Sequence, residues 1–211
     1  MKNIYGKTKN RLSTYNFNFL YFTANIFHTR LPQLPHKTTH MKALFIGRFQ
    51  PFHNGHLQAI RQIIKENELT YIGIGSTNEN TQPLNPFTCA ERYEMIESAL
   101  TATKIPPTKF RIIPIPNISN YALWPAHIET YIPPFEKIYT GSPIVKQLFT
   151  DYNGKIKKPY TIKEITKDLP ISATQVRELM LTNKKWEMLV PKTTSDLINK
   201  WNGVQRIKNI N

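Results

Sequence analysis

The residues with the clearest chemical potential lie in one segment, GRFQPFHNGH, which covers residues 47–56. His53 and His56 are three residues apart where a helix is predicted to begin, so both imidazoles lie on one side of its first turn. The N-terminus of a helix adds unpaired N–H groups and a partial positive charge. Gly47 carries no side chain, so a ligand can approach the backbone closely there. Together these groups form a site suited to phosphate oxygens.

Two other interpretations of the histidine pair stay open. A histidine at the start of a helix is commonly a solvated or capping residue that meets no ligand. A zinc site needs at least a third protein ligand, and His127 is the only other histidine after Met41. The position of the pair, directly after a buried strand and beside Gly47, favours phosphate binding over both alternatives.

A second basic element, ISATQVR, covers residues 171–177. Ser172 is a suitable N-cap for the helix that follows, and Arg177 lies on the second turn of that helix. The guanidinium of Arg177 is a planar fork that matches the geometry of phosphate. A capped surface helix without a ligand is the alternative interpretation.

The elements that would position these residues alternate between strand and helix. Apolar runs predict strands at 42–49, 70–75, 110–115 and 137–139. Helical periodicity and capping residues predict helices at 56–66, 88–101, 124–131, 143–149, 172–181 and 194–201. The alternation predicts an α/β fold with a doubly wound parallel sheet. In such a sheet ligands bind at the carboxyl ends of the strands, where the strand order reverses, so the turn after the first strand is the predicted site.

Composition narrows the class of protein. The single cysteine, Cys89, excludes an intrachain disulfide and fits a reducing, cytoplasmic location. No apolar stretch approaches the ~20 residues of a membrane span, so we expect no membrane partner. The formal net charge of +14 favours anionic partners, either nucleic acid or nucleotide phosphates.

Residues 1–40 differ from the rest of the chain. They hold six basic and no acidic residues and show no clear period, whereas residues 41–211 hold 22 basic and 14 acidic residues. We therefore predict a basic N-terminal extension at 1–40, disordered or outside the folded domain, and one domain at 41–211. A genuine basic tail and an organelle-targeting peptide are alternatives for 1–40. Because much of the excess charge lies there, and no aromatic-plus-basic motif stands out, the sequence argues against a nucleic-acid-binding protein.

The sequence resembles the H-x-G-H nucleotidyltransferase superfamily, and within it the archaeal type of nicotinamide-nucleotide adenylyltransferase. The segment GRFQPFHNGH carries the superfamily resemblance. Further similar motifs follow in order: GIGSTNE, NPFTCAER, ALWPAHI, YTGSPIV, ISATQVR and NGVQRIK. The resemblance extends from Met41 to Ile207. It implies a Rossmann-like nucleotidyltransferase fold with a C-terminal helical segment, and a role in NAD biosynthesis.

The resemblance also implies a reaction and its site residues. The phosphate of nicotinamide mononucleotide would attack the α-phosphorus of ATP, with Mg²⁺ held mainly by phosphates and water. The implied ATP contacts are Gly47, Arg48, Phe49, His53, Gly55, His56, Ser172, Thr174 and Arg177, of which His53, His56, Arg48 and Arg177 form the catalytic set. The implied mononucleotide contacts are Trp124, which would stack on the nicotinamide ring, and Asn117, Asn120 and Tyr121. Similar proteins are often homo-oligomers.

Two positions depart from the family pattern. Asn117 stands where the family has a carboxylate, and Tyr121 stands where it has an asparagine, although Asn120 is adjacent. The preference between amidated and deamidated mononucleotide therefore stays open. So do three alternatives for function: transfer to another phosphate acceptor such as phosphopantetheine, a basic nucleic-acid-binding protein, and a nucleotide sensor without turnover.

Overall fold

The computed structural model describes residues 41–165 and 169–211, so the predictions for residues 1–40 lie outside the described residues. Five parallel strands of this part form one sheet in the order β3-β2-β1-β4-β5. The strands are β1 (Lys42–Gly47), β2 (Leu69–Ile74), β3 (Phe110–Pro114), β4 (Lys137–Thr140) and β5 (Thr161–Glu164). The chain moves outward from β1 to β3 and then returns to the other side of β1. The predicted doubly wound parallel sheet is confirmed, and its order reverses between β1 and β4.

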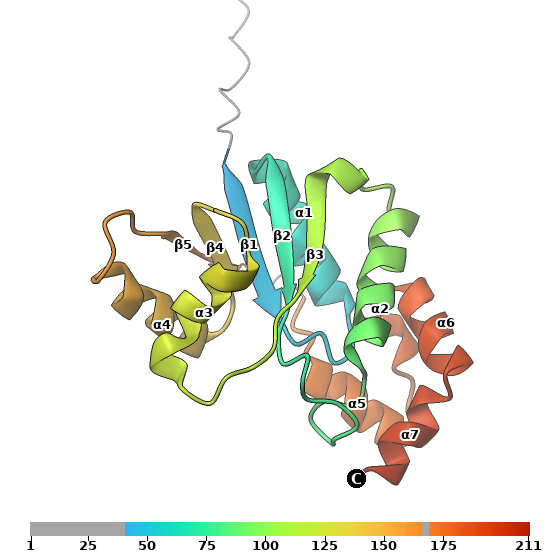
Figure 1. The fold of residues 1–211 in the computed structure, drawn as a ribbon. Coiled ribbons are helices and arrows are strands. Elements are labelled where there is room, and N and C mark those ends of the chain that lie inside the picture. The colour runs from blue at the N-terminus through green and yellow to red at the C-terminus, as the bar shows by residue number, and fades with distance from the viewer. Residues whose placement is uncertain (1–40, 166–168) are drawn as a thin grey trace, which may run out of the picture. The chain divides into compact units, whose positions relative to one another are not determined.

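Seven α-helices of the described chain surround the sheet, with α6 packed on α2 and α7 packed on α5 (Figure 1). They are α1 (Asn54–Glu66), α2 (Cys89–Ala102), α3 (Trp124–Tyr131), α4 (Pro143–Asn153), α5 (Ala173–Leu181), α6 (Lys192–Lys200) and α7 (Gly203–Asn209). Side-chain caps begin several of them: Thr88 and Glu91 form a capping box on α2, and Ser142 and Ser172 cap α4 and α5. None of the described helices is both long enough and apolar enough to cross a bilayer.

Some predicted bounds were wrong. The first strand ends at Gly47, not at residue 49, because Phe49 adopts a left-handed backbone conformation (φ 52°) that turns the chain. Strand β5 was not predicted, because three of its four residues are exposed at the sheet edge and form no apolar run. Helix α7 was also missed, and α4 continues to Asn153, beyond the predicted end at residue 149.

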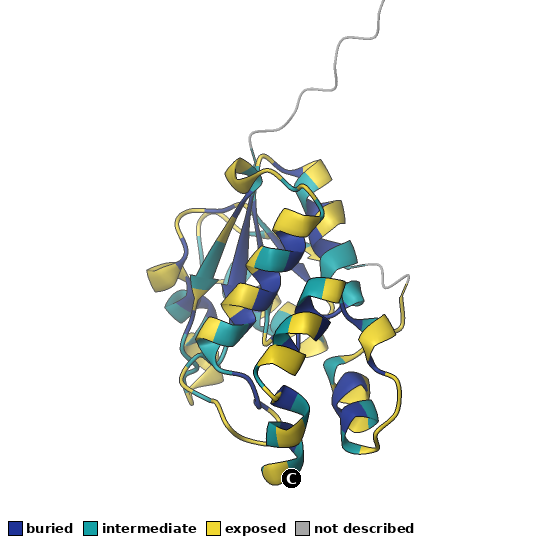
Figure 2. Cartoon of the chain, turned by 90° about the vertical axis from the view of Figure 1, so that its right-hand side faces the viewer, coloured by how far each residue is buried: buried dark blue, intermediate teal, exposed yellow. Residues whose placement is uncertain are grey.

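Two apolar cores lie on opposite faces of the sheet. In β1, Ala43 and Phe45 belong to one core, and Leu44 between them belongs to the other, as the two-residue period of a strand requires. The first core includes residues of α1, α2, α5, α6 and α7, and the second includes residues of α3 and α4. Figure 2 shows buried residues along the strands and on the inner sides of the helices.

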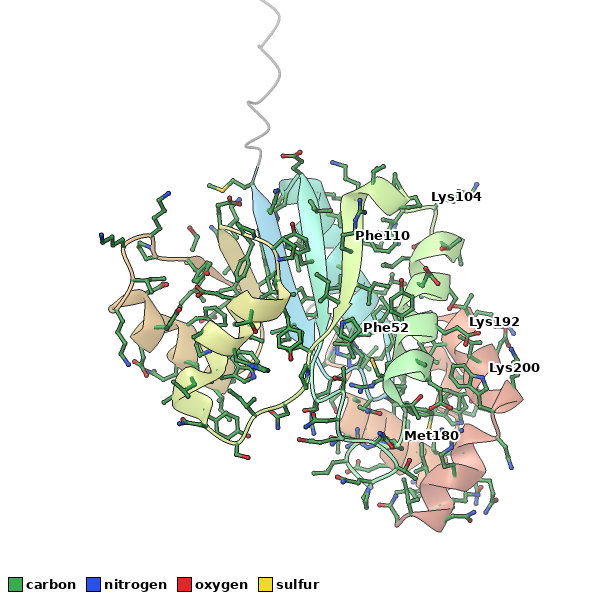
Figure 3. The ribbon with its side chains drawn as sticks, viewed as in Figure 1. Phe52, Lys104, Phe110, Met180, Lys192 and Lys200 are labelled. Carbon is green, nitrogen blue, oxygen red and sulfur yellow. The ribbon has the colours of Figure 1, made fainter. Side chains whose placement is uncertain are left out.

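The C-terminal helices complete the first core. Met180 of α5 and Phe52 of the turn after β1 are both fully buried in it, and Figure 3 shows them inside the molecule, whereas Lys104, Lys192 and Lys200 point outward. Glu91, at the start of α2, accepts hydrogen bonds of 2.7 and 2.8 Å from Arg206 of α7. This ion pair fastens the C-terminal segment to the helix that follows β2.

Candidate functional site

A cavity of about 400 Å³ opens beside the carboxyl end of β1. The beginnings of α1, α4 and α5 all contribute to its wall, so several helix N-termini face the same space. The lining includes every residue predicted to contact ATP: Gly47, Arg48, Phe49, His53, Gly55, His56, Ser172, Thr174 and Arg177. The fold thus brings together two motifs that are more than a hundred residues apart in the sequence.

His53 and His56 form a reciprocal capping box at the start of α1. The His56 N–H donates to Nδ1 of His53, and the His53 N–H donates to Nδ1 of His56, each over 3.3 Å. Their rings are stacked, with centroids 3.5 Å apart and planes 21° apart. A neutral imidazole that accepts at Nδ1 carries its proton at Nε2, so the caps select the tautomer with an Nε2–H donor on both rings.

Glycines and aromatic rings hold this pair in place. A Cβ atom on Gly55 would lie 3.1 Å from Nδ1 of His53, closer than ordinary van der Waals contact, so a larger residue would press on that ring. A Cβ atom on Gly47 would lie 3.0 Å from the ring of Phe49, which gives Gly47 a packing reason in addition to close ligand approach. The buried ring of Phe52 stacks against His56 with a centroid separation of 5.6 Å. The ring of His56 therefore packs against buried phenylalanine rings of the first core.

Arg177 reaches the same turn from α5. It is buried, with 7% of its surface exposed. Its guanidinium donates to the backbone oxygen of Gln50 over 2.7 Å and to Oγ1 of Thr174 over 3.3 Å. Burial, and to a lesser extent the nearby Arg48, lowers the pKa of Arg177 from its ordinary value. A buried guanidinium that donates to a backbone oxygen and a hydroxyl, as Arg177 does, is well suited to receive an anionic ligand.

A second cavity, of about 520 Å³, abuts the first. Both cavities are lined by Ile46, Gly47, Arg48 and Ser142. Of the predicted mononucleotide contacts, Trp124, Asn117 and Tyr121 line this second cavity. Trp124 also packs edge-on against Phe149 at 6.0 Å, so it serves the core and the cavity wall together.

Asn120 is the one predicted site residue that the structure brings to neither cavity. Its Oδ1 accepts the backbone N–H of Ala122 over 3.0 Å and caps the short 3-10 helix Tyr121–Leu123. The side chain of Asn120 is therefore used for local capping, a role that asparagine often has before a helical turn.

Glu79 is a cavity residue that sequence reasoning missed. It lies in the loop after β2, lines the second cavity, and accepts a hydrogen bond of 2.8 Å from Nδ2 of Asn117. A carboxylate therefore stands beside Asn117, although it comes from a different loop. Because the two residues are 38 positions apart, only the pairing of β2 with β3 brings them together.

Arg92 is a second functional candidate that sequence reasoning missed. It lies on α2, is fully buried, and donates to the backbone oxygens of Thr88, Arg48, Gly75 and Ser76. Burial, the largest cause, lowers the pKa of this guanidinium. Arg92 thereby connects the segments that follow β1 and β2, through Arg48, which lines both cavities, and through Gly75 and Ser76, which line the second. The segment NPFTCAER contains it, but nothing in the sequence distinguishes a buried arginine from a surface one.

The site defines a class of protein. A parallel sheet whose switch point carries a donor-rich cavity, next to a second cavity with an aromatic wall, is the architecture of a nucleotide-binding α/β enzyme. Residues 44–179 match the family described as cytidylyltransferase-like.

Comparison with related proteins assigns the chain to a narrower family. The chain is 40% identical over 169 residues to the nicotinamide-nucleotide adenylyltransferase of Thermococcus sibiricus, covering 80% of this chain and 88% of that protein. It is also 40% identical over 172 residues to the nicotinamide-nucleotide adenylyltransferase of Methanococcus vannielii, covering 81% and 95%. The chain belongs to the nicotinamide-nucleotide adenylyltransferase family within the cytidylyltransferase-like proteins.

A solved structure shares the fold. The bifunctional NMN adenylyltransferase/ADP ribose pyrophosphatase of Francisella tularensis superposes with a TM-score of 0.67 at 20% sequence identity. The similarity covers 81% of this chain and 53% of that one, so the present chain spans about half of the bifunctional protein.

Proposed function

We propose that this protein transfers the adenylyl group of ATP to nicotinamide mononucleotide, which forms NAD and releases pyrophosphate. The observation that supports this most directly is the pair of abutting cavities with a common wall at Gly47 and Arg48. One cavity is rich in hydrogen-bond donors, and the other has an indole in its wall. The names of the relatives point to the same reaction.

In this proposal the triphosphate of ATP occupies the first cavity. The Nε2–H groups of His53 and His56 donate to phosphate oxygens from the start of α1. Arg177, with Ser172 and Thr174, holds the β- and γ-phosphates from the start of α5. The backbone of Gly47, Phe49 and Gly55 allows close approach at the turn.

The second cavity takes the mononucleotide. Trp124 offers its π face to the cationic nicotinamide ring. Asn117 and Tyr121 supply polar contacts around that ring. Arg48 lines both cavities and is positioned to meet the phosphate groups of the two substrates where they approach each other.

The reaction needs no general base, because the attacking phosphate oxygen is already an anion. That oxygen forms a bond to the α-phosphorus of ATP while the bond from this phosphorus to the bridging oxygen breaks, and the electron pair leaves with pyrophosphate. Positioning and charge stabilisation then provide the catalysis. His56 and Arg177 would stabilise the charge that develops on the leaving group.

We propose Mg²⁺ as the companion of ATP. Lining groups of the first cavity are imidazoles, arginines, hydroxyls and N–H groups, which suit phosphate oxygens more than a metal ion. The described residues contain no group of three His, Cys, Asp or Glu side chains that could hold a metal. The ion would therefore be bound chiefly by phosphate and water oxygens, where it neutralises phosphate charge.

The test is product formation by the purified full-length chain. It is incubated with ATP, Mg²⁺ and one acceptor at a time: nicotinamide mononucleotide, phosphopantetheine or glycerol phosphate. Pyrophosphate release and NAD are both measured. We expect NAD to form at the rate of pyrophosphate release with nicotinamide mononucleotide only. Turnover with another acceptor and none with this one would contradict the proposal.

We also propose that the protein is a cytoplasmic homo-oligomer. The homo-oligomer follows from the family resemblance, and the location follows from the single cysteine, which fits a reducing compartment. Light scattering of the purified protein would measure the assembly, and cell fractionation would measure the location.

A further inference from the structure

The loops after β2 and β3 are joined by a polar network around Glu79. Oε1 of Glu79 accepts from Nδ2 of Asn117 over 2.8 Å, and Oε2 accepts from Nδ2 of Asn85 over 3.0 Å. Asn78 adds two bonds to the backbone of Asn117, one accepted by its Oδ1 from the N–H over 2.8 Å and one donated to the carbonyl oxygen. Asn117 is therefore held by both its side chain and its main chain.

This network decides which polar atoms face a ligand. A carboxylate only accepts hydrogen bonds, so Asn117 must turn its Nδ2 toward Glu79. The remaining polar heavy atom of the Asn117 amide, Oδ1, is an acceptor. Both residues line the second cavity, whose polar end at this point thus offers acceptors and a negative charge.

The positive charge that lines the second cavity comes from Arg48. Arg48 lines the wall that the two cavities have in common, whereas Glu79, Asn117 and Trp124 line the second cavity alone. Glu79 is the only carboxylate among the described residues of that lining. The hydroxyls of Tyr121, which is 58% exposed, and Ser76 are the neutral side-chain groups nearby that can also donate.

We propose that Glu79, acting with Asn117, makes the site select a pyridine mononucleotide with a carboxamide over the same molecule with a carboxylate. The inference rests on the proposed function and names Glu79 as the specificity-determining residue. A carboxamide –NH₂ donates to the acceptors at this end of the cavity. A carboxylate has no hydrogen to donate, leaves those acceptors unpaired, and is repelled by the charge of Glu79.

The experiment compares two substrates in three full-length proteins. With saturating ATP and Mg²⁺, kcat and KM are measured for nicotinamide mononucleotide and for nicotinic acid mononucleotide in the wild type, Glu79→Gln and Glu94→Gln. Glu94 is exposed on α2 and outside both cavities, so its variant controls for the change in net charge. In Glu79→Gln the new amide keeps an oxygen for Asn117. Because Oδ1 of Asn85 has no hydrogen-bond partner among the described residues, the Asn85 amide can turn to accept from the new nitrogen.

We expect the wild type to use the amidated substrate at least ~10-fold better in kcat/KM, the scale on which one unpaired or repelled polar group discriminates. Glu79→Gln should lower this ratio about 10-fold, mainly through a smaller KM for the acid, while the KM for ATP stays within a factor of about 2. Glu94→Gln should keep the wild-type ratio. Higher salt should weaken the wild-type discrimination, since screening reduces charge repulsion.

Three results would overturn the inference. They are equal use of both mononucleotides by the wild type, preference for the acid, and a ratio in Glu79→Gln that equals the ratio in Glu94→Gln. If Glu79→Gln fails to fold, which its thermal unfolding midpoint would reveal, the wild-type ratio still overturns the inference when it shows no preference for the amidated substrate. Failure of the proposed function looks different, because neither mononucleotide would then support pyrophosphate release.

Discussion

The two cavities differ in how their walls are held. In the first, His53 and His56 are fixed by backbone N–H groups of their own helix, and Arg177 is fixed by a backbone oxygen of the same turn. In the second, the bond between Glu79 and Asn117 joins two loops, so the side chain of Asn117 is oriented by a residue of the other loop.

This difference separates the part of the site that is locally encoded from the part that depends on loop pairing. Because the histidine pair caps its own helix, the two Nε2–H donors keep their direction whenever α1 is formed. A side chain held by another loop changes its donor pattern after a single substitution in either loop. We therefore expect substitutions in the first cavity to change mainly the rate of turnover, and substitutions in the second to change mainly the choice of substrate.

The largest expected effect comes from Arg92, whose hydrogen bonds connect the segments after β1 and β2. Arg92→Met should lower the free energy of unfolding by about 3–5 kcal/mol, because each buried carbonyl oxygen that loses its donor costs ~1–3 kcal/mol. Urea denaturation measures this change. Arg61→Met is the matched control, since Arg61 is exposed on α1 and should change stability by less than ~0.5 kcal/mol. If Arg92→Met is as stable as this control, the hydrogen bonds of Arg92 do not contribute to the free energy of unfolding.

The next effect tests the first cavity. His56→Ala should lower kcat by at least ~10²-fold, the scale for losing one preorganised donor. Because this change also removes the acceptor for the His53 N–H, His56→Asn provides the comparison: its side-chain oxygen can keep the cap but lacks the imidazole donor. Steady-state kinetics and thermal melts of both variants separate the two roles. If His56→Asn turns over like the wild type, the histidine serves the helix and not the reaction.

The smallest of these effects tests the second cavity. Trp124→Ala should raise the KM for nicotinamide mononucleotide roughly 10-fold, within the range of a desolvated cation–π contact, and leave the KM for ATP nearly unchanged. Initial rates with each substrate varied in turn provide both values. An equal rise in the two constants would assign Trp124 to the core alone, through its contact with Phe149.

Sequence reasoning succeeded where the signal is local. The apolar run before Gly47 and the N-cap Ser172 each depend on residues within one turn or strand, and the structure contains the predicted strand and cap. It failed at β5, where an exposed edge strand carries no apolar pattern. It also did not predict that the side chain of Asn120 caps a short 3-10 helix.

By itself, the sequence determined that a parallel α/β sheet forms and that the turn at residues 47–56 lies at the end of its first strand. Periodicity and capping are short-range properties, so they can be read without coordinates. The tertiary structure alone decided that Arg177 reaches the turn of the histidine pair, that Arg92 is buried under two strand ends, and that Glu79 meets Asn117. Those contacts join residues from separate turns, helices or loops, and their geometry exists only once packing has brought the backbone into place.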